Sequence, residues 1–575
     1  MQAPGETMRD QHEKRLLHME EERRNHEPLL KRARDAFVPA RGIFSGEDTK
    51  PRRVPRAMLN TTPLVAVRTA SSGLHAGLTN PARPWQKSTI KNDDLGEFGP
   101  VKTWLALCDD RMMRYYVRSG LYDALPFMYA EWIALGTMCG LMFEDPETLF
   151  RVEHYTMGQY WLATDYRGRH DTFARKLKMT VRQLVSRFGN PPDGVARLSR
   201  ETLDKWKRPD RREDPVEVLL FIEPSPDGGW RSYWYETANS GAPPFKVGAF
   251  DDNPILSALW EQREATDAYG SDCPGFMAHG IARALQTDEI NHSAAIERNG
   301  NPPMQGPAKS VILTPGAYNP VDAAHATGQN GGIRSVYQHN FESSGYQFNI
   351  QRRQQQINEA FFVDLFLMLT MDERAQRATA EEIIRKHDEK VQILGPALQK
   401  GNEMLRRLHE FSFGLLMKRS MPYWRGAIDG EPDLPPPPKE LMREGVEIVP
   451  EFISTLQQAM RASQIQGLER FATAAGTIAQ ITGRPSPKFN ADQWLDEFGT
   501  AVGVVPTVVR SDEEVAEIAA AEAQQQQMAQ MAQMAPALRD AAGAMRDAGD
   551  AVPQDGSVLQ ALSGALAGGQ MEVAL

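Results

Sequence analysis

Apolar residues recur at spacings of three and four in "WLALCDDRMMRYYVRSG" and "LYDALPFMYAEWIALGTMCGLMFED", which cover about residues 100–145. This spacing is that of one face of an α-helix, so it predicts a helical block with buried aromatic residues. From about residue 149 to 177 the period changes to two, and "RGRHD" marks a turn, which predicts strands. "MTVRQLVSRFGN" then predicts a short helix, with Thr180 as its N-cap and Gly189 at its end.

The middle of the chain alternates between strand and helix patterns. "VEVLLFIEPSPDGGWRSYWYE" predicts a hairpin that turns at Asp227-Gly228. Residues 255–298 carry a helical pattern, and so do residues from about 347 to 369. Between these two helices, residues 299–345 are rich in Gly, Pro and Asn and predict short strands only. The chain is therefore expected to run helix, small β excursion, and helix back.

The segment "MDERAQRATAEEIIRK" is expected to separate an apolar helix from a very long one. Thr379 and Glu382 have the spacing of a capping box, which predicts a helix that begins at residue 380. The helical pattern continues to about residue 419, so the helix is expected to be roughly 60 Å long. Gly395-Pro396 should kink it.

The two ends of the chain have simpler patterns. Residues 1 to about 30 predict a charged helix or arm, and residues 449–500 predict helices. Residues 512–548 are rich in Ala, Gln and Met, which favours a helix that packs against copies of itself; a frayed tail is the alternative. The fold class predicted by these patterns is α+β, mostly helical.

Composition narrows the function classes. The formal charge of −10 argues against a generic nucleic-acid coat. The three cysteines lie far apart and form no CxxC pair, which argues against a disulfide framework or structural zinc and fits a reducing cytoplasm. The sequence has no apolar run long enough to predict a membrane span, and the charged N-terminus lacks an apolar signal core.

The motifs of common enzymes are missing from the sequence. "GPAKS" at 306–310 lacks the frame of a phosphate-binding loop, and His12 and His18 have the wrong spacing for a zinc pair. Acidic pairs such as Asp109-Asp110 and Asp251-Asp252 are adjacent, so on a helix their side chains diverge. We therefore predict no active site, no cofactor and no metal site, and we expect the protein not to be an enzyme.

Several stretches, in order along the chain, carry a resemblance to a known family. The first includes a D-x-x-G-x-x-D turn, a T-x-x-Q helix start and an F-G pair, at Asp165, Gly168, Asp171, Thr180, Gln183, Phe188 and Gly189. The others are "AYGSDCPGFMAHGIARALQTDEIN", "NPPMQGPAKSVILTPGAYN", "RATAEEIIRK" and "VGVVPTVVRSDEEVAEI". Together, over about residues 30–530, they resemble the head-to-tail connector (portal) proteins of short-tailed, T7-like bacteriophages.

The resemblance implies a function without catalysis. It implies a dodecameric ring at one capsid vertex of the virion, assembled in the host cytoplasm, through which terminase packages double-stranded DNA that is later ejected. The implied partners are copies of the chain itself, the DNA in the channel, the major capsid protein, the terminase large subunit, a scaffold protein and tail or adaptor proteins, with no membrane. A non-viral self-assembling scaffold protein, or a virion enzyme such as a nuclease, is the alternative; the missing acid clusters argue against a nuclease.

The resemblance also implies a division into regions. These are an N-terminal arm (1–30), a wing of a helical block and a β-rich part (31–270), a first stem helix (271–298), a clip (299–345), a second stem helix (346–368), a channel loop (369–378), a long wing helix with the helices after it (379–500), crown helices (501–550) and a flexible tail (551–575).

Four arginines are the candidate DNA-facing or assembly residues. Arg374 and Arg377 lie in the expected channel loop, where DNA would meet them. Arg352 and Arg353, near the start of the second stem helix, are expected either to face the channel or to form salt bridges between subunits. Because DNA has to slide, a channel with few basic rings is preferable to one that binds phosphates tightly.

Overall fold

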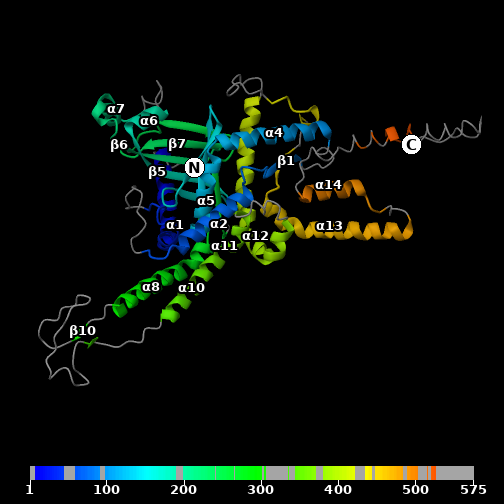
Figure 1. The fold of residues 1–575 in the computed structure, drawn as a ribbon. Helices are drawn as coiled ribbons and strands as arrows, with labels where there is room; N and C mark the ends of the chain where they lie inside the picture. Colours follow the sequence, from blue (N-terminus) through cyan, green and yellow to red (C-terminus); the bar gives the residue numbers. More distant parts are fainter. Residues whose placement is uncertain are drawn as a thin grey trace, which may run out of the picture. The chain divides into compact units, whose positions relative to one another are not determined.

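The computed structural model describes residues 7–44, 58–90, 98–188, 198–239, 241–264, 266–300, 304–305, 334–335, 343–370, 380–420, 434–442, 447–483, 488–502 and a few helical positions between 515 and 525. The chain divides into two compact units, of which the first holds residues 1–96 and 100–506, and the second holds residues 97–99 and 507–575. The elements of the first unit are shown in Figure 1. No helix in the described part is long and apolar enough to cross a membrane.

The N-terminal helix α1 (Met8–Phe37) continues past residue 30, where the N-terminal arm was expected to end, and its inner face is buried. Thr7 and Asp10 form a capping box at its start. Leu16 and Met19 enter a hydrophobic cluster whose other buried members are Trp161, Ala174, Leu219, Phe221, Tyr233 and Tyr235. Helix α1 is therefore part of the packed core of the first unit.

This cluster lies on an antiparallel five-stranded sheet. In spatial order, its strands are β4 (Trp161–Thr164), β5 (His170–Thr180), β6 (Pro215–Pro224), β7 (Trp230–Glu236) and β8 (Lys246–Phe250). The predicted hairpin at Asp227-Gly228 is confirmed, and Gly228 has a φ of +95°, which glycine adopts without strain. Three short helices follow strand β5: α6 (Val181–Phe188), α7 (Arg200–Lys207) and the 3-10 helix η2 (Pro209–Arg211).

The helical block predicted over 100–145 is correct only in part. Helices α4 (Gly99–Arg118) and α5 (Leu121–Leu135) are present, but residues 137–145 form strand β2 (Thr137–Asp145). Gly136, with a φ of +75°, ends α5 and starts the strand. Strand β2 lies between β3 (Leu149–Tyr155) and β9 (Ile255–Leu259). The helix predicted from residue 255 is therefore also wrong at its start, because residues 255–259 form strand β9.

Both errors have one physical cause. The first six residues of β2 and all five of β9 are buried, because β2 is the central strand of this sheet and both strands are covered by the rest of the unit. A strand buried on both faces has a continuous apolar run, without the alternation that identifies a half-exposed strand. Such a run cannot be distinguished from a buried helix by its periodicity.

A pair of helices leads away from this core and returns to it (Figure 1). Helix α8 (Pro274–Gly300) packs against α10 (Ser343–Ala360), and the short strands β10 (Met304–Gln305) and β11 (Arg334–Ser335) pair between them. The second helix is broken: Phe362 has a φ of +54°, and a separate helix, α11 (Val363–Thr370), packs against α2 (Thr62–Leu78). The remainder of the segment 301–342 lies outside the described residues.

The long helix α12 (Ala380–Ser420) has the length that its sequence pattern predicts. It contains Pro396, and Gly401 lets it pass close to Trp132, since an added Cβ would lie 3.0 Å from that ring. The residues expected to be helical from 449 begin instead with strand β12 (Ile448–Phe452), which pairs with β1 (Gln86–Ile90). Three further elements complete the unit: η5 (Lys439–Met442), α13 (Thr455–Thr482) and α14 (Ala491–Val502).

The three cysteines of the sequence are free and buried. Burial raises the pKa of the Cys108 and Cys273 thiols to about 12, and it raises that of Cys139 well above the usual value. Since the thiolate is the reactive form, none of the three has the properties of a nucleophile.

Candidate functional site

The α8–α10 pair carries two of the four arginines expected to face DNA or a neighbouring subunit. The Arg353 guanidinium on α10 lies 2.5 Å from Asp288 of α8, measured from Nε to Oδ2. Both side chains are partly buried, at 33% exposed for Arg353 and 19% for Asp288. Arg353 is therefore neutralised within its own chain, a pairing that sequence reasoning did not predict.

Arg352 has a different environment although it is the next residue on the same helix. Adjacent residues on an α-helix point about 100° apart, so Arg352 leaves the α8–α10 contact and is exposed. Of the two arginines on α10, Arg352 is therefore the one whose side chain is exposed.

Residues 369–370, expected to begin the channel loop, are the end of helix α11, and the rest of the expected loop lies outside the described part of the chain. Arg374, Arg377 and Thr379 fall in the segment 371–379, so the structure gives no position for them. Glu382 is the third residue of α12, which begins at Ala380, directly after the predicted cap residue. The structure does show how α11, the helix before this segment, is held.

Helix α11, which leads into residues 371–379, is held against α2 by a close contact. A Cβ added to Gly73 of α2 would lie 2.4 Å from the Cβ of Phe366 on α11, so only glycine fits there. The ring of Phe361, between α10 and α11, lies 4.9 Å from that of Phe37 at the end of α1. The end of α10 and the helix α11 after it are thus fixed by α1 and α2.

Helix α8 is joined to the start of α2 by a polar network. The Gln286 side chain accepts hydrogen bonds from the backbone N–H groups of Leu59 (2.9 Å) and Asn60 (3.1 Å), and it donates one to the Asn60 carbonyl at 2.6 Å. The Asn60 amide in turn donates to Glu289 of α8 at 2.6 Å. Sequence reasoning missed this contact, because its two sides lie more than 200 residues apart.

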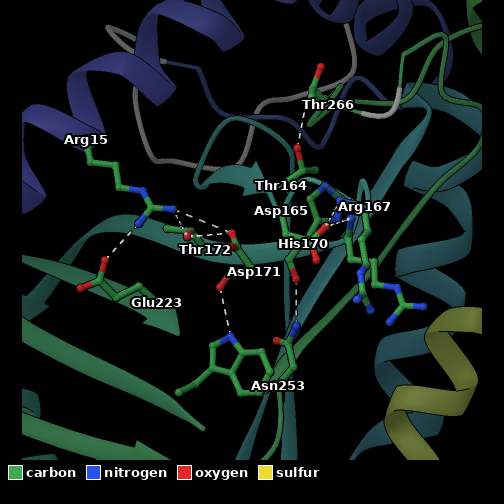
Figure 2. Close-up of polar contacts among 12 residues, drawn as sticks. Arg15, Thr164, Asp165, Arg167, His170, Asp171, Thr172, Glu223, Asn253 and Thr266 are labelled. Atoms are coloured by element: carbon green, nitrogen blue, oxygen red, sulfur yellow. Dashed lines mark hydrogen bonds and ion pairs between the residues drawn. The ribbon is translucent and has the colours of Figure 1, made fainter. Parts of the chain in front are cut away.

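The D-x-x-G-x-x-D motif forms the turn between β4 and β5 (Figure 2). One Asp165 carboxylate oxygen, Oδ1, accepts hydrogen bonds from the backbone N–H groups of Arg167 and Arg169, each at 2.8 Å. Gly168 has a φ of +77°, the left-handed conformation that glycine tolerates. The first aspartate and the glycine of the motif therefore set the shape of a turn.

The second aspartate of the motif contacts helix α1. Arg15 of α1 reaches toward Asp171 (3.9 Å between Nη2 and Oδ1), donates a hydrogen bond to Thr172 at 2.6 Å and pairs with Glu223 at 3.2 Å (Figure 2). Burial raises the pKa of Asp171, and the hydrogen bond from the Thr172 hydroxyl opposes the rise. The Trp230 indole donates to the Asp171 carbonyl at 3.1 Å. Asp171 thus connects the sheet to α1.

His170, between these residues, is buried in its neutral form. Its Nε2–H donates to the Ala268 carbonyl at 3.0 Å, and its Nδ1 accepts from the Ser257 hydroxyl at 2.8 Å. Burial lowers the pKa of His170 to about 4. Both ring nitrogens are occupied, so this histidine holds β5 against β9 and is not available for proton transfer.

The helix start predicted at Thr180 is confirmed. The Thr180 hydroxyl accepts from the Gln183 N–H at 3.2 Å, and the Gln183 side chain accepts from the Thr180 N–H at 3.0 Å. This reciprocal pair is a capping box at the start of α6. Gly189, expected to end the helix, lies outside the described residues.

One buried group of residues has the types of a catalytic triad but not its geometry. The Ser88 hydroxyl donates to Asp109 at 2.6 Å and accepts from Nε2 of His409 at 2.9 Å. In a hydrolytic triad the carboxylate orients the histidine, and the histidine takes the serine proton. Here the carboxylate holds the serine itself, and Ser88 is 2% exposed. The group joins β1, α4 and α12, and among the described residues no cluster of metal-ligating side chains is present.

Comparisons with known proteins agree on one family. The model for a bacteriophage head to tail connecting protein matches residues 9–509. The portal protein of Salmonella phage epsilon15 is 32% identical over 530 residues, which cover 89% of this chain and 91% of that protein. The probable portal protein of Bordetella phage BPP-1 is 31% identical over 535 residues, with coverage of 89% and 91%.

Solved structures of phage-like particles give weaker similarity. The virion of a native gene transfer agent particle matches with a TM-score of 0.34 and 10% identity, and the neck of an empty particle of this kind matches with 0.34 and 11%. Each match covers 79% of this chain and 96% of the other. These scores carry no argument about the fold.

The family match spans most of the sequence, and the two phage proteins exceed 30% identity over nearly nine-tenths of it, so the chain belongs to the family of bacteriophage head to tail connecting proteins.

Proposed function

We propose that this chain is the portal subunit of a phage particle and forms a ring, dodecameric by family resemblance, at one capsid vertex. Double-stranded DNA enters through the ring under the action of terminase and leaves through it later. The ring contacts the major capsid protein, a scaffold protein and tail or adaptor proteins. The protein acts as a structural conduit without catalysis, in virions assembled in the host cytoplasm. Its membership of the connector family and its relatives' names support this proposal.

The observation that carries the ring proposal is the exposed far part of the α8–α10 pair. The buried residues of α8 all lie in its first half; they are Pro274, Gly275, Ala278, Ala282 and Leu285. From residue 286 to 299 no described residue of α8 is buried, while Ile290 and Ile296 are 47% and 51% exposed, and Phe348 of α10 is 65% exposed. Among its described residues, this part of the α8–α10 pair has no buried residue on α8 and exposes three large apolar side chains, which another protein can cover. Neighbouring copies in a ring would cover it.

In this proposal α8 and α10 are the stem helices, and residues 299–345 are the clip. Residues 31–270 and 379–500 form the wing, and residues 501–550 form the crown. The N-terminal region belongs with the wing, because α1 packs into the same core. Arg352 faces the channel or a neighbouring subunit, whereas Arg353 ties α10 to α8.

Electron microscopy of the purified full-length protein tests the proposal. Rings with a central hole are the expected result. A monomer or a small dimer at every protein concentration would reject it and would leave the other self-assembling or enzymatic functions to be considered.

The channel loop has its own test. We expect the double variant Arg374→Ala/Arg377→Ala to form rings but to package DNA more slowly than wild type, because removing the charges removes phosphate contacts. The measurement is the DNA packaged per particle in an assembly reaction with terminase. Normal packaging by this variant would count against a direct DNA contact at Arg374 and Arg377.

A further inference from the structure

An open hollow of about 630 Å³ lies where β3, the end of β5 and α6 meet. Its lining residues are Arg151, Met179, Arg182, Gln183, Ser186 and Arg187. Every polar side chain in this lining carries hydrogen-bond donors, and none is a carboxylate. The hollow, which we call the arginine hollow, therefore has the chemistry of a site for a negatively charged group.

Two of the three arginines share a single counter-charge. Arg151 and Arg187 both contact the same oxygen of Glu153, Oε1, at 3.0 Å and 3.5 Å. The other oxygen of this carboxylate accepts a hydrogen bond from the Tyr155 hydroxyl at 2.6 Å. One carboxylate balances one of two guanidinium groups, so an excess positive charge remains at the wall of the hollow.

Aromatic rings hold these two guanidinium groups in place. Arg187 lies over the rings of Trp234 (5.0 Å) and Phe143 (5.4 Å), and Arg151 lies over Phe143 at 5.8 Å. Cation–π contact fixes a guanidinium while it leaves N–H donors at its edge for another partner. The Arg187 side chain is 27% exposed, so it is restrained but still accessible. Because these side chains are already restrained, they lose less conformational entropy when a ligand binds.

The third arginine is held loosely and can change partner. Arg182 lies on α6, whose first turn is fixed by the Thr180–Gln183 capping box. Its side chain is 66% exposed and pairs with Glu213, 62% exposed, at 2.7 Å. Surface pairs of this kind contribute little to stability, so a better-placed carboxylate can replace Glu213.

We propose that the arginine hollow is a docking site for an acidic segment of another protein, whose Asp or Glu carboxylates bind between Arg151, Arg182 and Arg187. Planar guanidinium groups bind carboxylates with paired hydrogen bonds. Duplex DNA fits less well, because Glu144 and Asp145 of β2 lie opposite Phe150 and Leu149, next to Arg151 on β3, and would repel a continuous polyanion. This docking site goes beyond the conduit proposed above, since it involves neither the channel nor the α8–α10 pair.

Fluorescence anisotropy with a synthetic probe tests the site on the full-length protein. The probe is a fluorescein-labelled decapeptide of alternating glutamate and serine, and its matched control has glutamine in place of glutamate. We expect saturable binding of the glutamate peptide that weakens with added salt, and no saturable binding of the glutamine peptide. Arg182→Gln should weaken binding by about fivefold or more, since it removes a charge-assisted contact.

Arg263→Gln is the matched control variant. Arg263 is also an exposed arginine in a surface pair, 69% exposed and 3.0 Å from Asp272, but it does not line the hollow. Its replacement should leave the affinity unchanged, and Arg187→Lys should give partial loss, because the charge remains and the planar contact is lost. Three results would each overturn the proposal. These are no binding of the glutamate peptide by wild type, an equal loss of affinity in Arg182→Gln and Arg263→Gln, and displacement of the labelled peptide by duplex DNA at a lower concentration than by unlabelled peptide. Electron microscopy of Arg182→Gln shows whether this variant still forms rings. Rings formed by a variant that has lost peptide binding show that the docking site and the portal function are tested independently.

Discussion

Glu131 of α5 is a carboxylate enclosed by the protein, at 4% exposed. It accepts hydrogen bonds from the Thr156 hydroxyl and from the Met157 N–H, the latter at 2.9 Å. Thr156 and Met157 in turn receive hydrogen bonds from the backbone of Gly42 and Ile43, just after α1. Burial raises the pKa of Glu131 to about 7, although these hydrogen bonds and the positive charge of Arg41 oppose the rise. One buried group thus links the α1 region to α5.

A pH dependence of stability follows from this raised pKa. An unfolded chain would release the Glu131 proton near the ordinary pKa of 4.5, whereas the folded protein holds it until about 7. The stabilising contribution is therefore complete below pH 4.5 and is lost as the pH rises through about 7, with a size on the order of 3 kcal/mol. Glu131→Gln, which cannot titrate, should lose less stability than wild type between pH 5 and 8. Urea unfolding of both proteins across this pH range measures the free energy of unfolding. Equal changes of this free energy with pH in the two proteins would contradict the prediction.

At the residue scale, the sequence predicted local chemistry well. The Thr180–Gln183 capping box and the Asp227-Gly228 turn depend on residues within a few positions of each other, so their pattern is visible in the sequence. The partners of Arg353 and Gln286 are 65 and 226 residues away, and no local pattern identifies them. Without the fold, an arginine on a helix reads equally well as a DNA contact or as a salt bridge.

At the scale of elements, helices were predicted where a polar face alternates with an apolar one, as along α12. Strands β2 and β9 were missed because they are buried along most of their length and lack that alternation. The break between α10 and α11 at Phe362 was missed for another reason. Phe362 has a positive φ although it is not a glycine, so the sequence carries no signal of a break there.

The close approach of α2 and α11 predicts a large effect of a small substitution. Gly73→Ala places a methyl group against Phe366, so we expect it to lower the free energy of unfolding by roughly 1–3 kcal/mol. Gly280→Ala is the matched control, because nothing lies within 4 Å of its added Cβ, and alanine should stabilise α8 by up to about 1 kcal/mol. Chemical denaturation of both variants checks the difference. Equal stability would show that α11 moves away without cost.

The salt bridge between α8 and α10 can be tested by reversing it. Arg353→Asp alone places two carboxylates together and should lower the unfolding free energy by about 1 kcal/mol or more. Adding Asp288→Arg restores opposite charges across the same contact, so the double variant should recover part of the loss. Thermal unfolding of the three proteins measures the recovery. No recovery would return Arg353 to the role of a channel or intersubunit residue.

At the scale of the whole molecule, the exposed apolar residues of the α8–α10 pair predict which substitutions reduce ring formation. Phe348→Ser should reduce ring formation, because it removes a 65% exposed aromatic side chain that a neighbouring copy would cover. Phe348→Leu keeps an apolar side chain and should assemble nearly as wild type does. Sedimentation velocity measures the fraction in rings, and far-UV circular dichroism checks that both variants fold. Normal assembly of the serine variant would exclude this contact.

Because Cys108, Cys139 and Cys273 are buried, the native protein has no thiol that reacts readily with labelling reagents. Their thiols are shielded from maleimide reagents and remain protonated at neutral pH. A single cysteine introduced at an exposed position outside the α8–α10 pair, such as Tyr166 (80% exposed), would then be the one readily labelled group in each subunit. Spectroscopic reporters could be attached there without first removing the native cysteines, and distances between neighbouring subunits could be followed while particles fill with DNA.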